Sequence, residues 1–267
     1  MNNFPQRIIC MTEETTETIY LLGEQDRIVG ISGYTVRPEI ARKEKPRISA
    51  FTRANIKKIL ALEPDLVLGF SDMQADIAAK LIRAGIAVHI FNQRSVDGIF
   101  KMITLLGNML GVPGKTEKLV KELRINLDQY QSVARTFKTN PVIYFEEWDE
   151  PLISGIGWVS ELIELAGGQD CYAEFAKESA AINRIIKDPQ DVVRRNPDII
   201  IGSWCGKHFR PEKVSQRTGW DKITAVKHQH LYEIKSANIL QPGPAALTDG
   251  IEQISQILHQ HALSQSA

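Results

Sequence analysis

The feature that most constrains this chain is a phrase that occurs twice. Residues 59–69 read ILALEPDLVLG and residues 192–202 read VVRRNPDIIIG, about half the chain length apart. Each copy consists of a helix end, a Pro-Asp turn and an apolar run without alternation. Such a run is typical of a strand that is buried on both faces of a parallel sheet. The repeat therefore predicts two similar α/β lobes.

Strand and helix patterns alternate around each copy, which predicts parallel sheets with right-handed crossovers. We expect strands at residues 7–10, 28–31, 66–68, 88–91, 142–145, 199–201 and 230–234. We expect helices at residues 15–22, 55–62, 76–84, 160–166, 188–194 and 245–259. Gly23, Gly85 and Gly167 stand where three of these helices should end.

One long amphipathic helix is predicted between the two halves. Residues 115–137 contain neither Gly nor Pro, and their apolar side chains recur at a spacing of three to four. We therefore expect an N-terminal lobe over residues 1–94, a helical connection over 95–138 and a C-terminal lobe over 139–267. The expected fold is α/β, with two Rossmann-like lobes joined by one long helix and a ligand crevice between them.

Composition excludes several classes of protein. Lys plus Arg (32) equal Asp plus Glu (32), so the chain lacks the positive charge of most nucleic-acid binders. The three cysteines are too few and too far apart for a disulfide scaffold. No apolar stretch is long enough to span a membrane, and the first residues show no secretory signal. We expect a cytoplasmic monomer if Met1 is the native start, and a periplasmic one if a leader was removed.

Two motifs suggest ligand chemistry but lack the partners that it needs. Residues 114–116 resemble the end of a phosphate-binding loop, yet Pro113 removes a donor amide and a helical pattern precedes it in place of a strand. His228 and His230 lie at strand spacing, but no third ligand accompanies them. We therefore predict neither a nucleotide site nor a metal site, and we expect the later His259 and His261 to be exposed.

A third motif keeps an enzymatic alternative open. Cys205 and His208 follow the second buried strand, which is where α/β sheets place ligands. A thiolate activated by a histidine could act on a bound cofactor. No orienting Asp or Asn can be assigned from the sequence, so we expect a binding protein and not an enzyme.

Aromatic side chains follow the predicted strands in both halves. They are Tyr34, Phe51 and Phe70 in the first half and Trp148 and Trp204 in the second. Core residues would lie inside strands and helices, whereas these are expected just beyond the strand ends that face a crevice. Large flat side chains on both lobes predict a large, flat, partly apolar ligand.

At these residues the sequence resembles the vitamin B12 and iron-chelate substrate-binding proteins of ABC importers, and most closely the cobalamin-binding branch. The resemblance covers nearly the whole chain. It is carried by residues 16–17, 27–32, 61–67, 147–152, 154–155, 161–168 and 242–244. It implies two Rossmann-like lobes, one long helix, and a metal chelate bound without chemistry. The resemblance implies that Tyr34, Phe51 and Phe70 correspond by position to first-lobe aromatic residues that line the corrinoid site, and that Trp148 and Trp204 belong to second-lobe loops facing the same space.

The resemblance also marks departures from the family. Importer-coupled relatives present one acidic residue on each lobe to the permease, and here those positions are Lys57 and Gln190. A positive lysine or a neutral glutamine at these positions removes the electrostatic steering that acidic residues supply in docking to a permease. Arg184 stands near a position where the family has a second-lobe aromatic residue.

The expected function is therefore non-enzymatic binding of a corrinoid or a similar metal chelate, uncoupled from import. Arg184, Lys207 and Arg210 are expected to contact peripheral carboxylate, amide or phosphate groups of this ligand. The alternatives are an importer component for cobalamin, an iron-siderophore or haem, and the Cys205 enzyme.

Overall fold

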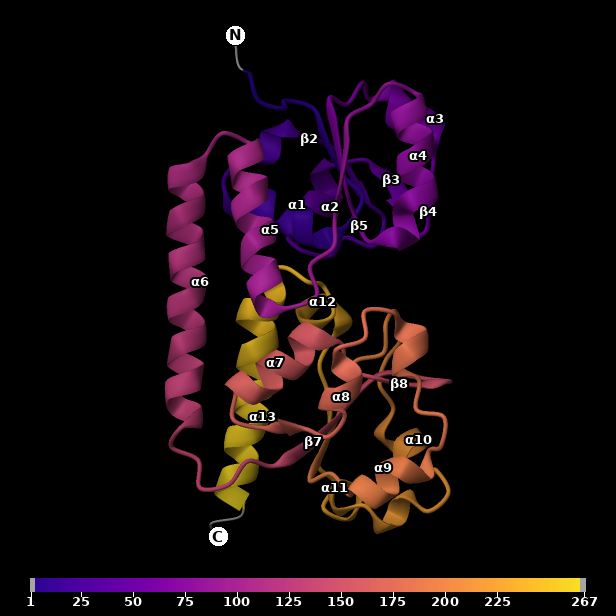
Figure 1. Ribbon diagram of the computed structural model, residues 1–267, viewed down its shortest axis with the longest axis vertical. Coiled ribbons are helices and arrows are strands. Elements are labelled where there is room, and N and C mark those ends of the chain that lie inside the picture. The colour runs from indigo at the N-terminus through magenta and orange to yellow at the C-terminus, as the bar shows by residue number, and fades with distance from the viewer. Residues whose placement is uncertain (1–2, 265–267) are drawn as a thin grey trace. The chain divides into compact units, whose positions relative to one another are not determined.

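The computed structural model describes residues 3–264, which form two compact units (Figure 1). The first contains the chain up to Gln93 together with Asp97–Glu122. The second contains Arg94–Val96 and the chain from Leu123 onward. Each unit is built on a mainly parallel sheet, so the predicted α/β class is confirmed. No helix within residues 3–264 is both long and apolar enough to cross a membrane.

The first unit holds a six-stranded sheet in the order β4-β3-β2-β1-β5-β6, parallel except for the β3–β4 hairpin. Its strands are β1 (Ile8–Cys10), β2 (Ile28–Ser32), β3 (Arg47–Ala50), β4 (Arg53–Ala54), β5 (Leu66–Phe70) and β6 (Val88–Phe91). Its helices are α1 (Glu13–Leu21), α2 (Glu39–Glu44), α3 (Ile56–Ala61), α4 (Ala75–Arg83) and α5 (Val96–Met109). In Figure 1, α3 and α4 lie on one side of the strands and α5 lies on the other. Ile9, Met11 and Val67 are at the centre of its core.

The second unit holds a sheet in the order β11-β10-β7-β8, with β9 also paired to β7. Its strands are β7 (Val142–Asp149), β8 (Leu152–Ser154), β9 (Gln169–Asp170), β10 (Ile199–Gly202) and β11 (Leu231–Glu233). Its helices are α7 (Gly157–Leu165), α8 (Ala173–Ala176), α9 (Gln190–Arg195), α10 (Pro211–Ser215), α11 (Thr224–Lys227), α12 (Ser236–Ile239) and α13 (Ile251–Ser264). Its core is unusually aromatic, with Tyr144, Tyr172, Trp204, Phe209 and Trp220 all buried together.

The repeated Pro-Asp phrase performs the same task in each unit. The Asp65 carboxylate accepts the backbone N–H groups of Gln6 (2.6 Å) and Arg7 (3.0 Å) just before β1. The Asp198 carboxylate accepts the N–H of Val142 (2.9 Å), the first residue of β7. Each aspartate thus ties the beginning of its own strand to the beginning of the neighbouring one.

The residue before each proline lies in the left-handed region of backbone space. Glu63 and Asn196 both have φ of +47°. This conformation is uncommon for residues other than glycine, and asparagine tolerates it better than glutamate. The second copy of the turn is therefore built from the more suitable residue.

The long helix α6 runs over Pro113–Ala134, two residues earlier at its start than predicted and three earlier at its end. Proline suits the first turn because that position needs no N–H donor. The glycines predicted to end helices do so with positive φ, at Gly23 (+69°), Gly85 (+84°) and Gly167 (+93°). The strands that the sequence did not predict are β3, β4, β8 and β9, each two to four residues long.

Candidate functional site: the carboxyl ends of the strands

In the first unit, the predicted ligand residues lie beyond or at the ends of three strands. Tyr34 follows β2 and is 67% exposed. Phe51 is half-buried in the turn between β3 and β4. Phe70 differs from the expectation, because β5 is two residues longer than predicted. Phe70 is its last residue, pairs with Phe91 of β6 and is buried.

Gln74 holds this edge of the sheet together. Its side-chain oxygen accepts the Phe70 N–H (3.0 Å), and its amide nitrogen donates to the Phe51 carbonyl (2.8 Å). Gln74 is fully buried, so a non-polar replacement would remove both of these hydrogen bonds. Gly69 makes room for it, since a Cβ at Gly69 would lie 2.5 Å from the Gln74 side-chain oxygen. Sequence reasoning missed Gln74.

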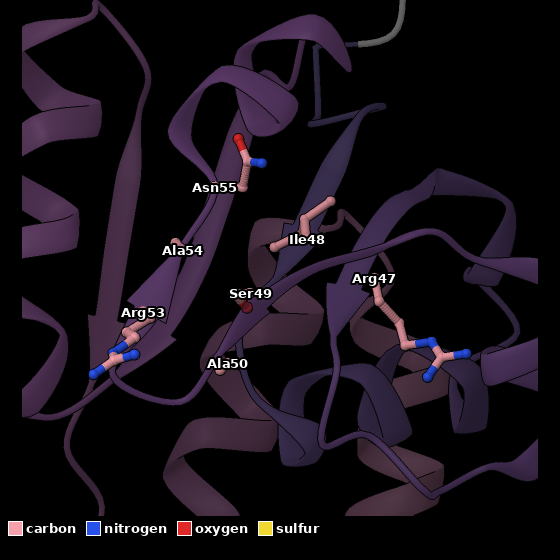
Figure 2. A pocket seen from close by; sticks show the side chains of 7 residues that line it. All are labelled: Arg47, Ile48, Ser49, Ala50, Arg53, Ala54 and Asn55. Atoms are coloured by element: carbon pink, nitrogen blue, oxygen red, sulfur yellow. The ribbon is translucent and has the colours of Figure 1, made fainter.

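A shallow concavity of about 570 Å³ lies along the same hairpin. It is lined by Arg47, Ile48, Ser49, Ala50, Arg53, Ala54 and Asn55 (Figure 2). Figure 2 shows Arg47 and Arg53 extending away from each other. Their guanidinium groups therefore do not converge on one anion.

Three carboxyl groups are buried where β1 gives way to α1. Glu13, Glu14 and Glu17 lie in the first turns of α1 and are each at most 6% exposed. Arg37 pairs with one of them, its Nε lying 2.9 Å from the Glu17 carboxylate. Desolvation raises the pKa of Glu13 to about 8 and that of Glu14 to about 7. Burial therefore shifts both groups toward the protonated, neutral form, and Glu13 further than Glu14.

In the second unit, the carboxyl end of β7 carries three acids and one aromatic side chain in a row, Glu146, Glu147, Trp148 and Asp149. A β-bulge shifts the pairing with β8 between Glu146 and Trp148, which turns neighbouring side chains in different directions. Trp148 is half-buried, and its indole N–H donates to the Glu150 carbonyl (2.8 Å). Trp148 was expected beyond a strand, but β7 extends four residues past the predicted end and includes it.

Trp204 also differs from the expectation, because it belongs to the core of the second unit. It is 3% exposed and packs edge-on against Phe209, with ring centroids 5.1 Å apart. Its indole N–H donates to the Glu146 carboxylate (2.9 Å). Arg217 binds the same carboxylate through two nitrogens, at 2.6 and 2.8 Å, so the buried charge of Glu146 is fully paired.

Two further cations on this face are already paired with acids of β7. Arg184 is 1% exposed, and its guanidinium binds the two Glu147 oxygens at 2.5 and 3.2 Å. Lys207 forms an ion pair with Asp149. Arg184 and Lys207 therefore do not offer the free charge that we expected for a ligand, whereas Arg210 is exposed at the start of α10.

The geometry does not support activation of Cys205 by His208. The His208 imidazole is 89% exposed, and its Nδ1 lies 3.8 Å from the Glu233 carboxylate. Desolvation, and then the Glu147 carboxylate, raise the pKa of the Cys205 thiol although the residue as a whole is exposed. A raised pKa opposes formation of the thiolate that a nucleophile needs.

The remaining predicted residues lie away from the carboxyl end of β7, and one of them is buried. Lys57 is exposed in the first turn of α3. Gln190 begins α9, and its side chain donates to the Thr218 carbonyl (2.7 Å). His261 is buried, contrary to expectation, because α13 places it edge-on against His230 with ring centroids 4.9 Å apart. In the part of the chain that the structure describes, no trio of His, Cys, Asp or Glu side chains is arranged to hold a metal ion.

Comparison with known proteins supports the resemblance. A family model described as "Periplasmic binding protein" matches residues 8–237. The ABC transporter substrate-binding lipoprotein YvrC of Bacillus subtilis is 27% identical over 96% of this chain and 80% of its own length. A vitamin B12-binding protein of Vibrio parahaemolyticus is 25% identical over 94% of this chain and 90% of its own. The haem-binding protein RhuT of Roseiflexus shares the fold, with a TM-score of 0.80 at 22% identity over 94% of this chain and 98% of its own.

These comparisons correct one expectation and leave a second without support. A cytoplasmic location is wrong, because the family model is that of periplasmic proteins and YvrC is a lipoprotein of an ABC transporter. Uncoupling from import has no support, because the relatives are of the importer type. The names of two of these similar proteins give vitamin B12 and haem as the ligands that those proteins bind. The chain has two α/β units with mainly parallel sheets and one long helix, and the family model matches most of its length. It belongs to the periplasmic binding protein family.

Proposed function

We propose that this protein binds a corrinoid, or a flat metal chelate with similarly neutral amide side chains, as the binding component of an ABC importer. The aromatic contacts would come from Tyr34, Phe51, Trp148 and Trp204, whereas Phe70 is buried at the end of β5. Indole and phenyl rings contribute large apolar contact areas to a flat macrocycle, which favours binding without any reaction.

The observation that carries the choice of ligand is the charge state of the second unit's face. Acids at positions 146, 147 and 149 of β7 are paired with Arg217, Arg184 and Lys207 respectively. A ligand with several carboxylates would need these cations, and separating a buried ion pair leaves its acid uncompensated. A neutral ligand leaves the pairs of Glu146 with Arg217 and of Glu147 with Arg184 intact. Arg210 remains for one peripheral polar group.

The experiment is a titration of the purified protein with cyanocobalamin, haemin and a ferric hydroxamate siderophore. Binding is followed by the visible absorption of the ligand and by calorimetry. We expect cyanocobalamin to bind at least tenfold more tightly than haemin. Tighter binding of haemin would overturn the choice of ligand and favour the haem alternative.

Importer coupling is tested at the two positions where the resemblance implies acidic docking residues. The double variant Lys57→Glu, Gln190→Glu would supply the charges that relatives present to a permease. If this protein serves a permease with a matching docking surface of its own, the double variant should reduce ligand uptake in a reconstituted importer and leave ligand affinity unchanged. Increased uptake would show that the native residues do not suit the permease.

A further inference from the structure

Trp204 is covered in this structure, although the proposed function requires it to contact a ligand. The indole edge is held by Glu146, and one side of the ring meets Phe209. The Lys207 ammonium lies over the ring, 5.1 Å from its centroid. A ligand can reach Trp204 only if one of these groups moves.

Lys207 is the member of this set that can leave. Phe209 and Glu146 are buried, and Glu146 is held by Arg217. The Lys207 side chain is 40% exposed. Its backbone N–H closes a turn onto the Trp204 carbonyl (3.3 Å), with Gly206 in the left-handed region at φ +77° and open space around that glycine.

Two attractions hold the ammonium in place. It lies 4.0 Å from the centroid of the Trp148 ring, within the range of a cation–π interaction, and it pairs with the Asp149 carboxylate. Lys207 thus occupies the space next to both indoles that a flat ligand would use. The two occupants compete for the same aromatic surface.

We propose that Lys207 governs access to the Trp148–Trp204 surface: its ammonium covers the indoles in the free protein, and a flat ligand binds by displacing it. This inference rests on the proposed function for its ligand, but not for the cover itself. It makes Lys207 a competitor of the ligand where sequence reasoning expected a contact.

The cover is tested first without any ligand, by acrylamide quenching of tryptophan fluorescence. The Lys207 ammonium lies over the rings of Trp148 and Trp204, so a Trp148→Phe background leaves Trp204 as the tryptophan that responds to Lys207. In this background, Lys207→Ala should raise the quenching constant of Trp204 about threefold or more. Asp149→Asn should raise it less, because it loosens the ammonium without removing it. Lys213→Ala, which removes an equal charge from an exposed position of α10, should leave it unchanged.

Binding of cyanocobalamin provides the second test, on the otherwise native protein. Loss of a cation–π contact on the order of 1 kcal/mol corresponds to roughly fivefold tighter binding of the competing ligand. Lys207→Ala should therefore bind cyanocobalamin about fivefold more tightly than wild type, and Lys213→Ala should match wild type.

The outcomes separate this inference from the proposed function. Unchanged quenching of Trp204 in Lys207→Ala would overturn the cover. Weaker binding of cyanocobalamin by Lys207→Ala would make Lys207 a ligand contact and would also overturn it. If wild type does not bind cyanocobalamin, the proposed ligand fails, and the quenching experiment still decides whether Lys207 covers Trp204.

Discussion

Replacing Glu13 with Gln should stabilise the protein at neutral and alkaline pH but not at pH 5. The folded state raises the pKa of Glu13 from 4.5 to about 8, mainly through desolvation, with Glu17 and Glu14 adding repulsion. Between these two values the folded state holds a proton that the unfolded chain has released. The contribution of Glu13 to the unfolding free energy is therefore fully present below about pH 4.5. It is lost as the pH rises from there to the folded pKa of about 8. The slope is at most about 1.4 kcal/mol per pH unit for one carboxyl group.

The assay is urea unfolding followed by circular dichroism at pH 5, 6, 7 and 8. The difference in unfolding free energy between Glu13→Gln and wild type should grow with pH, reaching on the order of 2 kcal/mol at pH 8 once relaxation around the site is allowed for. Glu117→Gln, at an exposed position of α6, serves as the matched control and should follow wild type at every pH. A difference that stays constant or shrinks from pH 5 to pH 8 would refute the reasoning.

Three further substitutions test other parts of the structure. Gln74→Leu should lower the unfolding free energy by about 2–3 kcal/mol and weaken cyanocobalamin binding, because it removes the two hydrogen bonds that position Phe51 and the end of β5. Unchanged affinity in a folded variant would show that Gln74 has no part in the site. Asp65→Ala and Asp198→Ala should each cost about 1–2 kcal/mol in urea unfolding, and the loss should be larger for Asp65, which accepts two N–H groups. Desolvation, then the nearby His230, lower the pKa of His261, so its contribution to stability should be lost as pH falls below about 6.5. In His261→Leu, the Tm should therefore depend less on pH between pH 7 and pH 5 than in wild type. An equal slope of Tm against pH would contradict this.

The sheets could be predicted because their central strands are continuous apolar runs that begin at conspicuous turns. β5 and β10 follow the two Pro-Asp turns, and α6 carries a regular apolar spacing over six turns. β4 and β9 have two residues each, which is too short for any periodicity to appear. They form because the neighbouring strand supplies partners, and that information is not local.

The candidate site was only partly predictable for the same reason. An aromatic residue after a strand predicts a loop residue, but Trp204 is buried in the core, where its N–H donates to Glu146, 58 positions earlier. The sequence alone does not show that Arg184 is paired, because its partner Glu147 lies 37 positions earlier and is brought next to it by the fold. The run of acids after the apolar start of β7 was the local indication that cations from elsewhere in the chain pair with this strand.

The paired Pro-Asp turns also have a consequence for how the chain folds. Each turn closes a loop of similar length, with 58 positions between Arg7 and Asp65 and 56 between Val142 and Asp198. Closing such loops costs entropy before any neighbouring contact repays it, so proteins with distant pairings fold slowly. In both units the central strand pair, β1–β5 or β7–β10, therefore forms late. Neither pair can form until more than fifty residues beyond its first strand have left the ribosome.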